Sequence, residues 1–271
     1  MSDKPIVSAV SDVESTVKRD RWQRPVVVTP SGEHKAYRRA STVVEALDSH
    51  FGLDVYKQRL LARGLAARSD LVTAIHTASK KDLGAVCEAA MEAAGASVAS
   101  RNGSTMHALT ERLDLGLPMP KGLPDHIRAM LRVYAEAMEQ FEVIDTERFV
   151  VQDKIEVAGT YDRRLRDTMT GESHIADLKT GQNLDLMALK TTAQIAVYAG
   201  SMLYDLDGGR EPLGVSQEFG IMVWLPWTED PTEAICEVRW PDLKKGREAI
   251  THAFRIEGWR KLKAETLMPA V

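Results

Sequence analysis

The sequence predicts a mixed α/β fold in which helices flank a central sheet. Two observations lead to this class. From residue 123 onward, hydrophobic periodicity gives the order helix, three strands, helix, two strands, which is typical of a sheet covered by helices. The chain also has 271 residues, 44% of them hydrophobic and 27% charged, which suits a soluble globular protein with a sizeable core.

The N-terminal half is predicted to contain an arm and then helices. Residues 1–35 mix Pro, Ser, Asp and Lys without a sustained period, so we expect a loosely ordered arm. Residues 36–122 are expected to form a helical section. Thr42 and Glu45 have the spacing of a capping box, and the alanine-rich segment 81–99 predicts a helix ending near Gly95.

Residues 123–271 are predicted to form the α/β core. Segment 123–141 places apolar residues at helical spacing, with Pro124 suited to its first turn. The remaining elements follow from alternation, turn residues and helical spacing. Strands are expected at 147–151, 154–166, 173–179, 218–227 and 232–240, a helix at 186–204, and a basic helix from about Pro241.

Composition excludes several classes of protein. The formal net charge is −4, which argues against a histone-like coat but not against an enzyme with carboxylates at its centre. The apolar runs are far shorter than the ~20 residues of a membrane helix, and the first residues lack a secretory pattern. We therefore expect a cytoplasmic protein with no membrane association. The two cysteines, Cys87 and Cys236, are expected to be buried and inert.

The most informative stretch is residues 159–198. Asp177 and Lys179 stand two apart on a predicted strand, so both side chains leave one face of the sheet. Asp162 lies on the neighbouring strand and is expected to reach the same spot, since facing residues on paired strands are ~5 Å apart. Two carboxylates form a hard oxygen-rich pocket suited to Mg²⁺ or Mn²⁺, and a nearby lysine stabilises negative charge that develops during phosphoryl transfer.

An acid followed two places later by lysine is weak evidence alone, because the chain contains it three times. The other copies are Glu33 with Lys35 and Asp242 with Lys244. The copy at Asp177 differs in its context: Gly159 and Thr160 precede Asp162, a Thr-Gly turn follows, and the next helix carries Gln194 and Tyr198 four apart on one face.

These motifs, GTYD, IADLKTG and AQIAVY, together with the earlier GSTMH, resemble the PD-(D/E)XK nuclease superfamily. The likeness is greatest to its RecB-like exonuclease branch, which includes CRISPR-associated adaptation nucleases and relatives in bacteriophage genomes. The resemblance implies a restriction-endonuclease-like core, a DNA substrate and divalent-metal hydrolysis of phosphodiesters. It implies roles for the following residues: His107, Asp162, Asp177 and the main-chain carbonyl of Leu178 as metal ligands, Lys179 as the paired lysine, and Gln194 and Tyr198 as the helix motif.

The chain departs from the family pattern in two respects. Tyr161 stands where the superfamily's name has proline, which leaves the Asp162 carboxylate in place. The cysteines that hold an iron–sulfur cluster in several relatives are absent, and two cysteines cannot supply four thiolates. We therefore expect Mg²⁺ or Mn²⁺ and no iron–sulfur cluster.

The sequence allows two interpretations for several basic residues and for one acid. One group of basic residues either contacts DNA phosphates or forms a solvated strand rim, and the two interpretations are equally supported. The group consists of Arg163, Arg164 and Arg166. The segment 243–263 carries a net charge of +5. It either grips the DNA backbone or is a solvated helix face, and the second is slightly favoured. Glu111, one turn after His107, either supports the site or faces solvent, and the second is favoured.

The sequence thus predicts a metal-dependent DNA exonuclease acting in recombination, repair or phage DNA processing, in a bacterial or phage-infected cell. In the implied mechanism a metal-bound water attacks the phosphorus, and Lys179 orients the water or stabilises charge. Two alternatives stay open: a catalytically silent DNA-binding or assembly subunit with the same fold, and a structure-specific endonuclease. The resemblance to ring-forming relatives leaves room for a homo-oligomer or a recombination partner protein.

Overall fold

The computed structural model describes residues 17–268, and the chain forms two compact units. The larger unit comprises Met1–Asp48 and His107–Val271, and the smaller one comprises Ser49–Met106. The division that the sequence suggested between residues 122 and 123 stays a prediction. In the described part of the chain, no helix is long and apolar enough to cross a membrane.

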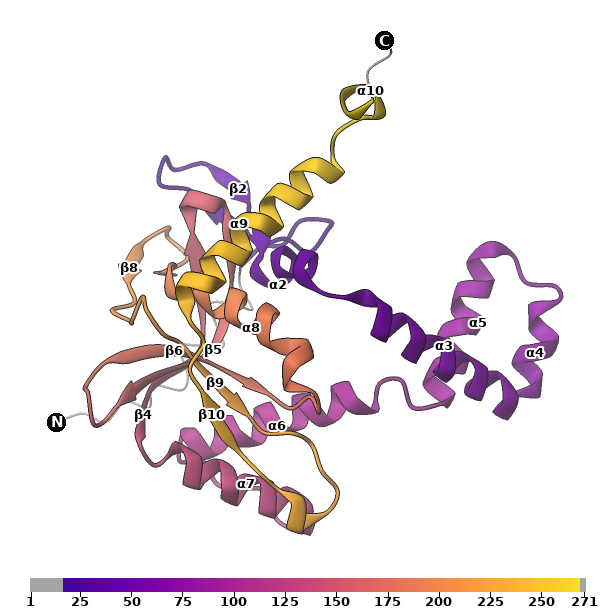
Figure 1. Ribbon diagram of the computed structural model, residues 1–271, viewed down its shortest axis with the longest axis horizontal. Helices are drawn as coiled ribbons and strands as arrows, with labels where there is room; N and C mark the ends of the chain where they lie inside the picture. Colours follow the sequence, from indigo (N-terminus) through magenta and orange to yellow (C-terminus); the bar gives the residue numbers. More distant parts are fainter. Residues whose placement is uncertain (1–16, 269–271) are drawn as a thin grey trace. The chain divides into compact units, whose positions relative to one another are not determined.

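The larger unit is built on a mixed eight-stranded sheet, as predicted (Figure 1). Its strand order is β10-β9-β6-β5-β4-β7-β8, with β3 added beside β5; β6 with β9 and β3 with β5 are parallel, and the other pairs are antiparallel. The strands are β3 (Arg38–Arg39), β4 (Phe141–Gln152), β5 (Val157–Asp167), β6 (Ser173–Lys179), β7 (Met202–Tyr204), β8 (Arg210–Pro212), β9 (Ile221–Trp224) and β10 (Glu237–Arg239).

Helices cover both faces of this sheet (Figure 1). One face carries α8 (Leu184–Ala199), which contacts β4, β5, β6 and β9, and α9 (Leu243–Arg260), which packs on α8. The two helices approach closely because α9 has Gly246 at the crossing, where a Cβ would lie 2.6 Å from the carbonyl oxygen of Thr192. The opposite face carries α7 (Asp125–Met138) and the part of α6 (Val98–Asp114) from His107 onward.

The amphipathic period of segment 123–141 is confirmed in α7. Its buried residues are Ile127, Met130, Leu131, Tyr134 and Met138, which are the positions that the spacing selected. The helix ends at Met138, and Phe141 begins β4 instead of ending the helix. Short elements complete the larger unit: α2 (Ala40–Val44), the 3₁₀ turns η2 (Glu45–Leu47), η3 (Asp153–Ile155) and η4 (Pro231–Glu233), and the final helix α10 (Ala264–Leu267).

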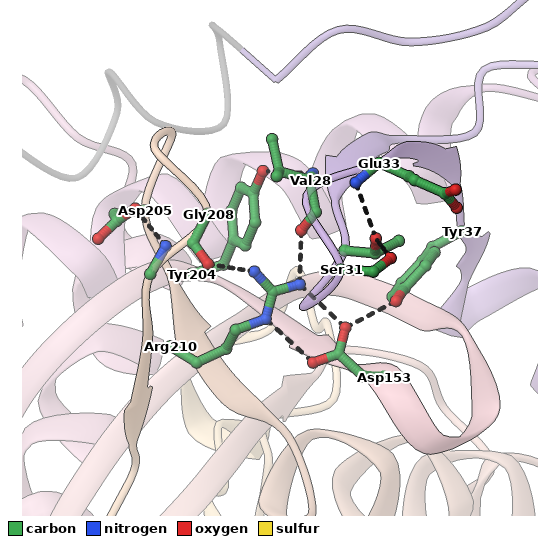
Figure 2. Close-up of polar contacts among 11 residues, drawn as sticks. Val28, Ser31, Glu33, Tyr37, Asp153, Tyr204, Asp205, Gly208 and Arg210 are labelled. Carbon is green, nitrogen blue, oxygen red and sulfur yellow. Dashed lines mark hydrogen bonds and ion pairs between the residues drawn. The ribbon is translucent and has the colours of Figure 1, made fainter.

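The described part of the expected N-terminal arm is an ordered hairpin, which corrects that expectation. Strand β1 (Val26–Val28) pairs with β2 (His34–Ala36), and a polar network fixes the hairpin to the sheet (Figure 2). The Val28 amide donates to the Tyr204 hydroxyl at 2.9 Å, and Arg210 donates to the Val28 carbonyl at 2.7 Å. Asp153 accepts from both Arg210 and the Tyr37 hydroxyl, so one carboxylate joins the hairpin to β8. Residues 1–16 lie outside the described residues.

The smaller unit is helical and lies within residues 36–122, for which helices are expected. It contains α3 (His50–Ala67), α4 (Ser69–Ile75), α5 (Lys80–Ala93) and the start of α6. Helices α3 and α5 touch at Gly64, where a Cβ would lie 1.7 Å from the Ala90 carbonyl oxygen, so only glycine fits. Helix α5 ends next to Gly95 at φ +86°, which confirms the predicted stop.

The capping box predicted at Thr42 and Glu45 is wrong. Helix α2 already begins at Ala40, directly after β3 pairs with β5, and its N-cap is Arg39 without a side-chain capping bond. Thr42 instead accepts a hydrogen bond from Arg39, and Glu45 forms an ion pair with Lys190 at 2.7 Å. The tertiary position of β3 therefore sets the helix start.

Candidate active site

A gap along one edge of β5 creates the candidate site. On this edge β3 pairs with Val157 and Ala158, and β6 pairs with residues 163–166. The GTYD motif, residues 159–162, lies between the two paired stretches. At the end of this motif the Leu178 amide of β6 donates a hydrogen bond to Oδ2 of Asp162 at 2.9 Å, where a paired strand would offer a backbone carbonyl. The strands thus part where the acid enters the site.

Asp177 and Lys179 lie together on β6, as their spacing predicts. Lys179 Nζ is 2.6 Å from Asp177 Oδ2, and the side chains are 28% and 3% exposed. Burial raises the pKa of Asp177 to about 6; the Lys179 ammonium opposes this, and the negative charge of Asp162 adds to it. Desolvation lowers the pKa of Lys179, but the charges of Asp177 and Asp162 outweigh it and raise that pKa. The lysine therefore stays protonated between two acids.

His107 brings α6 to the same place. Its Nδ1 lies 3.5 Å from Oδ2 of Asp162, and its ring also contacts the main chain of Leu178. Burial lowers the pKa of His107 below its usual 6.5, against the attraction of Asp162. The imidazole is therefore mostly neutral at pH 7, the form in which a histidine coordinates metal.

Gln194 and Tyr198 form a contacting pair on α8. Gln194 Nε2 donates to the Tyr198 hydroxyl at 3.3 Å, and that hydroxyl lies 3.0 Å from where a Cβ of Gly159 would be. The glycine of the GTYD motif thus packs tightly against the tyrosine ring of the helix motif, and Asp162 follows three residues later. That these two residues position Lys179 or the DNA is a prediction.

Arg163 and Arg164 lie inside the fold, which corrects the expectation that they contact phosphates or form a solvated rim. The Arg163 side chain is 3% exposed and pairs with Asp114 on α6 at 2.5 Å. It also donates to Thr110 at 2.7 Å. Arg164 pairs with Asp145 at 2.5 Å and donates to the Leu213 carbonyl. Buried guanidiniums need such partners, so neither is available to a DNA backbone.

Arg166 and Lys244 are exposed. Arg166 pairs with Glu142 on the neighbouring strand at 2.9 Å, in the manner of a strand rim. Lys244 stands in the first turn of α9, whose N-cap Asp242 accepts the Lys244 amide hydrogen at 2.9 Å. That capping bond gives the Asp242–Lys244 pair a structural explanation. On α9, Ile250 is buried and Trp259 is 63% exposed.

Two residues at or near the site were missed or misjudged from the sequence. Asp114 accepts hydrogen bonds from Arg163 and from the Tyr134 hydroxyl, and Glu111 accepts one from Thr146 at 3.1 Å instead of facing solvent. The helical period offered a signal, since 107, 111 and 114 share one face of α6. That face points to β4 and β5.

The two cysteines differ from the expectation in their burial. Cys87 and Cys236 are both free and half-buried instead of fully buried. Burial raises the pKa of the Cys236 thiol to about 12, so it is protonated at neutral pH, which fits an inert side chain.

The oxygen and nitrogen donors at the site are those that a hard divalent cation prefers, although both carboxylates contact other groups of the protein. Among residues 17–268, no group of three or more His, Cys, Asp and Glu side chains stands ready to hold a metal. Asp162 faces the Leu178 amide, and Asp177 faces Lys179. Yet Oδ2 of Asp177 is buried and, within the described chain, makes no hydrogen bond of good geometry beyond that ion pair. A buried carboxylate of this kind, beside a second carboxylate and a neutral imidazole, fits such an ion.

The fold and these side chains define a class of protein, the metal-dependent nucleases built on a restriction-endonuclease-like sheet. The model of the PD-(D/E)XK nuclease superfamily matches residues 55–214, more than half of the chain, and the chain belongs to this superfamily. No curated protein matches it. Membership implies a nuclease that cleaves nucleic acid with a divalent metal, usually Mg²⁺ or Mn²⁺.

Proposed function

We propose that the chain is a Mg²⁺- or Mn²⁺-dependent DNA exonuclease of the RecB-like branch. One observation carries the proposal: His107, Asp162, Asp177 and Lys179 come from three elements, α6, β5 and β6, and meet at the gap in the β5 edge. A silent subunit would have no need to keep a half-buried lysine against two acids, since such an arrangement costs desolvation free energy.

The residues have distinct roles in this proposal. His107, Asp162, Asp177 and the carbonyl of Leu178 hold the metal, which when bound supplies a lowered water pKa and polarises a phosphoryl oxygen. The Asp162 hydrogen bond fixes the Leu178 peptide, and so the direction of its carbonyl. Lys179 remains protonated and places its ammonium where negative charge develops on the phosphate. The broader role, in recombination, repair or phage DNA processing, is part of the same proposal.

Incubation with four DNA substrates tests this function. Linear and covalently closed circular DNA, each single- and double-stranded, are incubated with Mg²⁺, Mn²⁺ or EDTA. We expect linear DNA to be degraded with either metal, EDTA to stop the reaction, and the closed circles to survive. Cutting of the circles at a similar rate would make the protein an endonuclease. Binding without any cleavage would make it a silent subunit, and activity in EDTA would refute the metal site.

A further inference from the structure

An exposed tryptophan stands between two arginines in the turn that precedes β1. The Trp22 side chain is 58% exposed. The guanidinium carbons of Arg21 and Arg24 lie 3.8 Å and 4.9 Å from the centre of its ring. An exposed aromatic ring beside guanidiniums is the arrangement on which the bases of single-stranded nucleic acids stack.

Asp20 holds this turn in shape. Its Oδ1 accepts the amide hydrogens of Trp22 at 3.0 Å and Arg24 at 2.9 Å. Its Oδ2 accepts the Arg24 side chain at 2.7 Å. Segment 18–24 carries four basic residues against this one acid, so the ring lies in a strongly positive surface whose shape is set before any partner arrives.

A polar cavity of about 250 Å³ opens at the base of the turn. Arg19 and Pro25 line it from the turn, and Thr160 lines it from β5, two residues from Asp162. Two strand residues span ~7 Å, so the cavity is next to the candidate active site. Arg39, Ser41 and Tyr198 add cationic and hydroxyl groups to its wall, a composition that suits a phosphate oxyanion.

We propose that this surface, defined as residues 18–25 with Arg39 and Ser41 and called the Trp22 surface, binds single-stranded DNA. A base stacks on the Trp22 ring in place of one of the two guanidiniums, and a backbone phosphate occupies the cavity. Duplex bases are already stacked on each other, so an exposed ring beside guanidiniums selects unpaired ones. The inference rests on the proposed function for its DNA substrate. The Trp22 surface precedes residues 55–214, the region that the family model matches, so it is a feature of this chain and not of the family core.

Binding of a fluorescein-labelled oligothymidylate in EDTA tests the proposal without cleavage. Fluorescence anisotropy is measured for the wild type, Trp22→Ala, Trp22→Phe and Trp259→Ala. Trp259 is the matched control, because it is 63% exposed on the basic helix α9. We expect Trp22→Ala to weaken binding by about 5- to 100-fold, Trp22→Phe to retain most of it, and the control to match the wild type.

Two further measurements separate stacking from charge and from misfolding. Arg39→Gln is expected to reduce the slope of log affinity against log salt by roughly 0.7, the loss of one phosphate contact on a single strand. Blunt duplex DNA is expected to bind Trp22→Ala as it binds the wild type. Thermal unfolding is expected to be unchanged in every variant, because these side chains are exposed.

The outcomes distinguish this inference from the proposed function. Wild-type affinity in Trp22→Ala, or an equal loss in Trp259→Ala or on duplex DNA, would overturn the single-strand surface even if the protein degrades DNA. If single strands bind through Trp22 but no metal supports cleavage, the surface stands and the nuclease function fails.

Discussion

Replacing Asp114 with asparagine is expected to loosen the attachment of α6 to the sheet. Asp114 accepts Arg163 Nε at 2.5 Å and the Tyr134 hydroxyl at 2.8 Å, and the Arg163 and Asp114 side chains are only 3% and 4% exposed. Asparagine keeps the shape of the side chain but removes its charge. Its NH₂ group is a hydrogen-bond donor, and it would face Arg163 and the Tyr134 hydroxyl, which are donors as well. His107 stands two turns earlier on the same helix, so the site loses support as well.

The magnitude follows from the burial of the pair. Removing one partner of a buried ion pair costs about 3–5 kcal/mol because the other charge stays in the interior. For a unit of this size each kcal/mol lowers the melting temperature by roughly 2–4 °C. We therefore expect Asp114→Asn to lower it by about 6–20 °C in EDTA at pH 7, measured by circular dichroism.

Glu142→Gln is the matched control for this experiment. The Arg166–Glu142 pair also spans a carboxylate and a guanidinium, at 2.9 Å, but its side chains are 47% and 59% exposed. Exposed pairs contribute about 0–1 kcal/mol, so the control is expected to fall by less than about 4 °C. Equal melting temperatures for the two variants would refute the view that burial gives the Asp114 pair its importance.

Four further predictions concern the site. Lys179→Ala is expected to lower the single-turnover rate at least ~100-fold with little change in DNA binding, whereas Lys244→Ala is expected to keep the wild-type rate. The reverse result would show that the active site lies at Lys244 and not at Lys179. Asp177→Asn is expected to abolish cleavage. In EDTA the wild type is also expected to lose stability relative to Asp177→Asn as the pH rises from 4 to 7. Burial raises the Asp177 pKa from 3.8 to about 6, so the neutral carboxyl stabilises the fold below about pH 4, and this contribution of roughly 3 kcal/mol is lost as the pH rises through 6. Parallel pH profiles of melting temperature for the two proteins would contradict this. His107→Ala is expected to weaken metal affinity about 10-fold or more in a calorimetric titration, and an unchanged titration would make it a core residue. The purified protein is expected to be colourless and free of stoichiometric iron, and absorbance near ~400 nm would require unrecognised ligands.

The sequence predicted the elements whose signals are local. The buried face of α7 follows from the spacing of Ile127, Met130 and Tyr134, and the approach of Lys179 to Asp177 follows from strand alternation. These patterns depend on neighbours within a few residues. The mixed sheet follows from the order of such elements, and it too is confirmed.

The sequence failed where partners are distant along the chain. Arg163 resembles its neighbours in a run of arginines, and its burial depends on Asp114, which is 49 positions away. Strands β7 and β8 have three residues each, too short for an alternation signal; β7 pairs with the edge of β4, and β8 pairs with β7. The same holds for the N-terminal hairpin, whose partners follow it by more than a hundred positions.

The anchoring of that hairpin has a kinetic consequence. Val28 bonds to Tyr204 across 176 positions and to Arg210 across 182, so these contacts form only after most of the chain has emerged from the ribosome. Folding is slow when such long loops must close, because the entropy of closure is lost before the contacts stabilise the structure. Among the described residues, the strands nearest the N-terminus, β1 and β2, are therefore among the last to dock, and until then the edge of the sheet at β7 and β8 is without its cover.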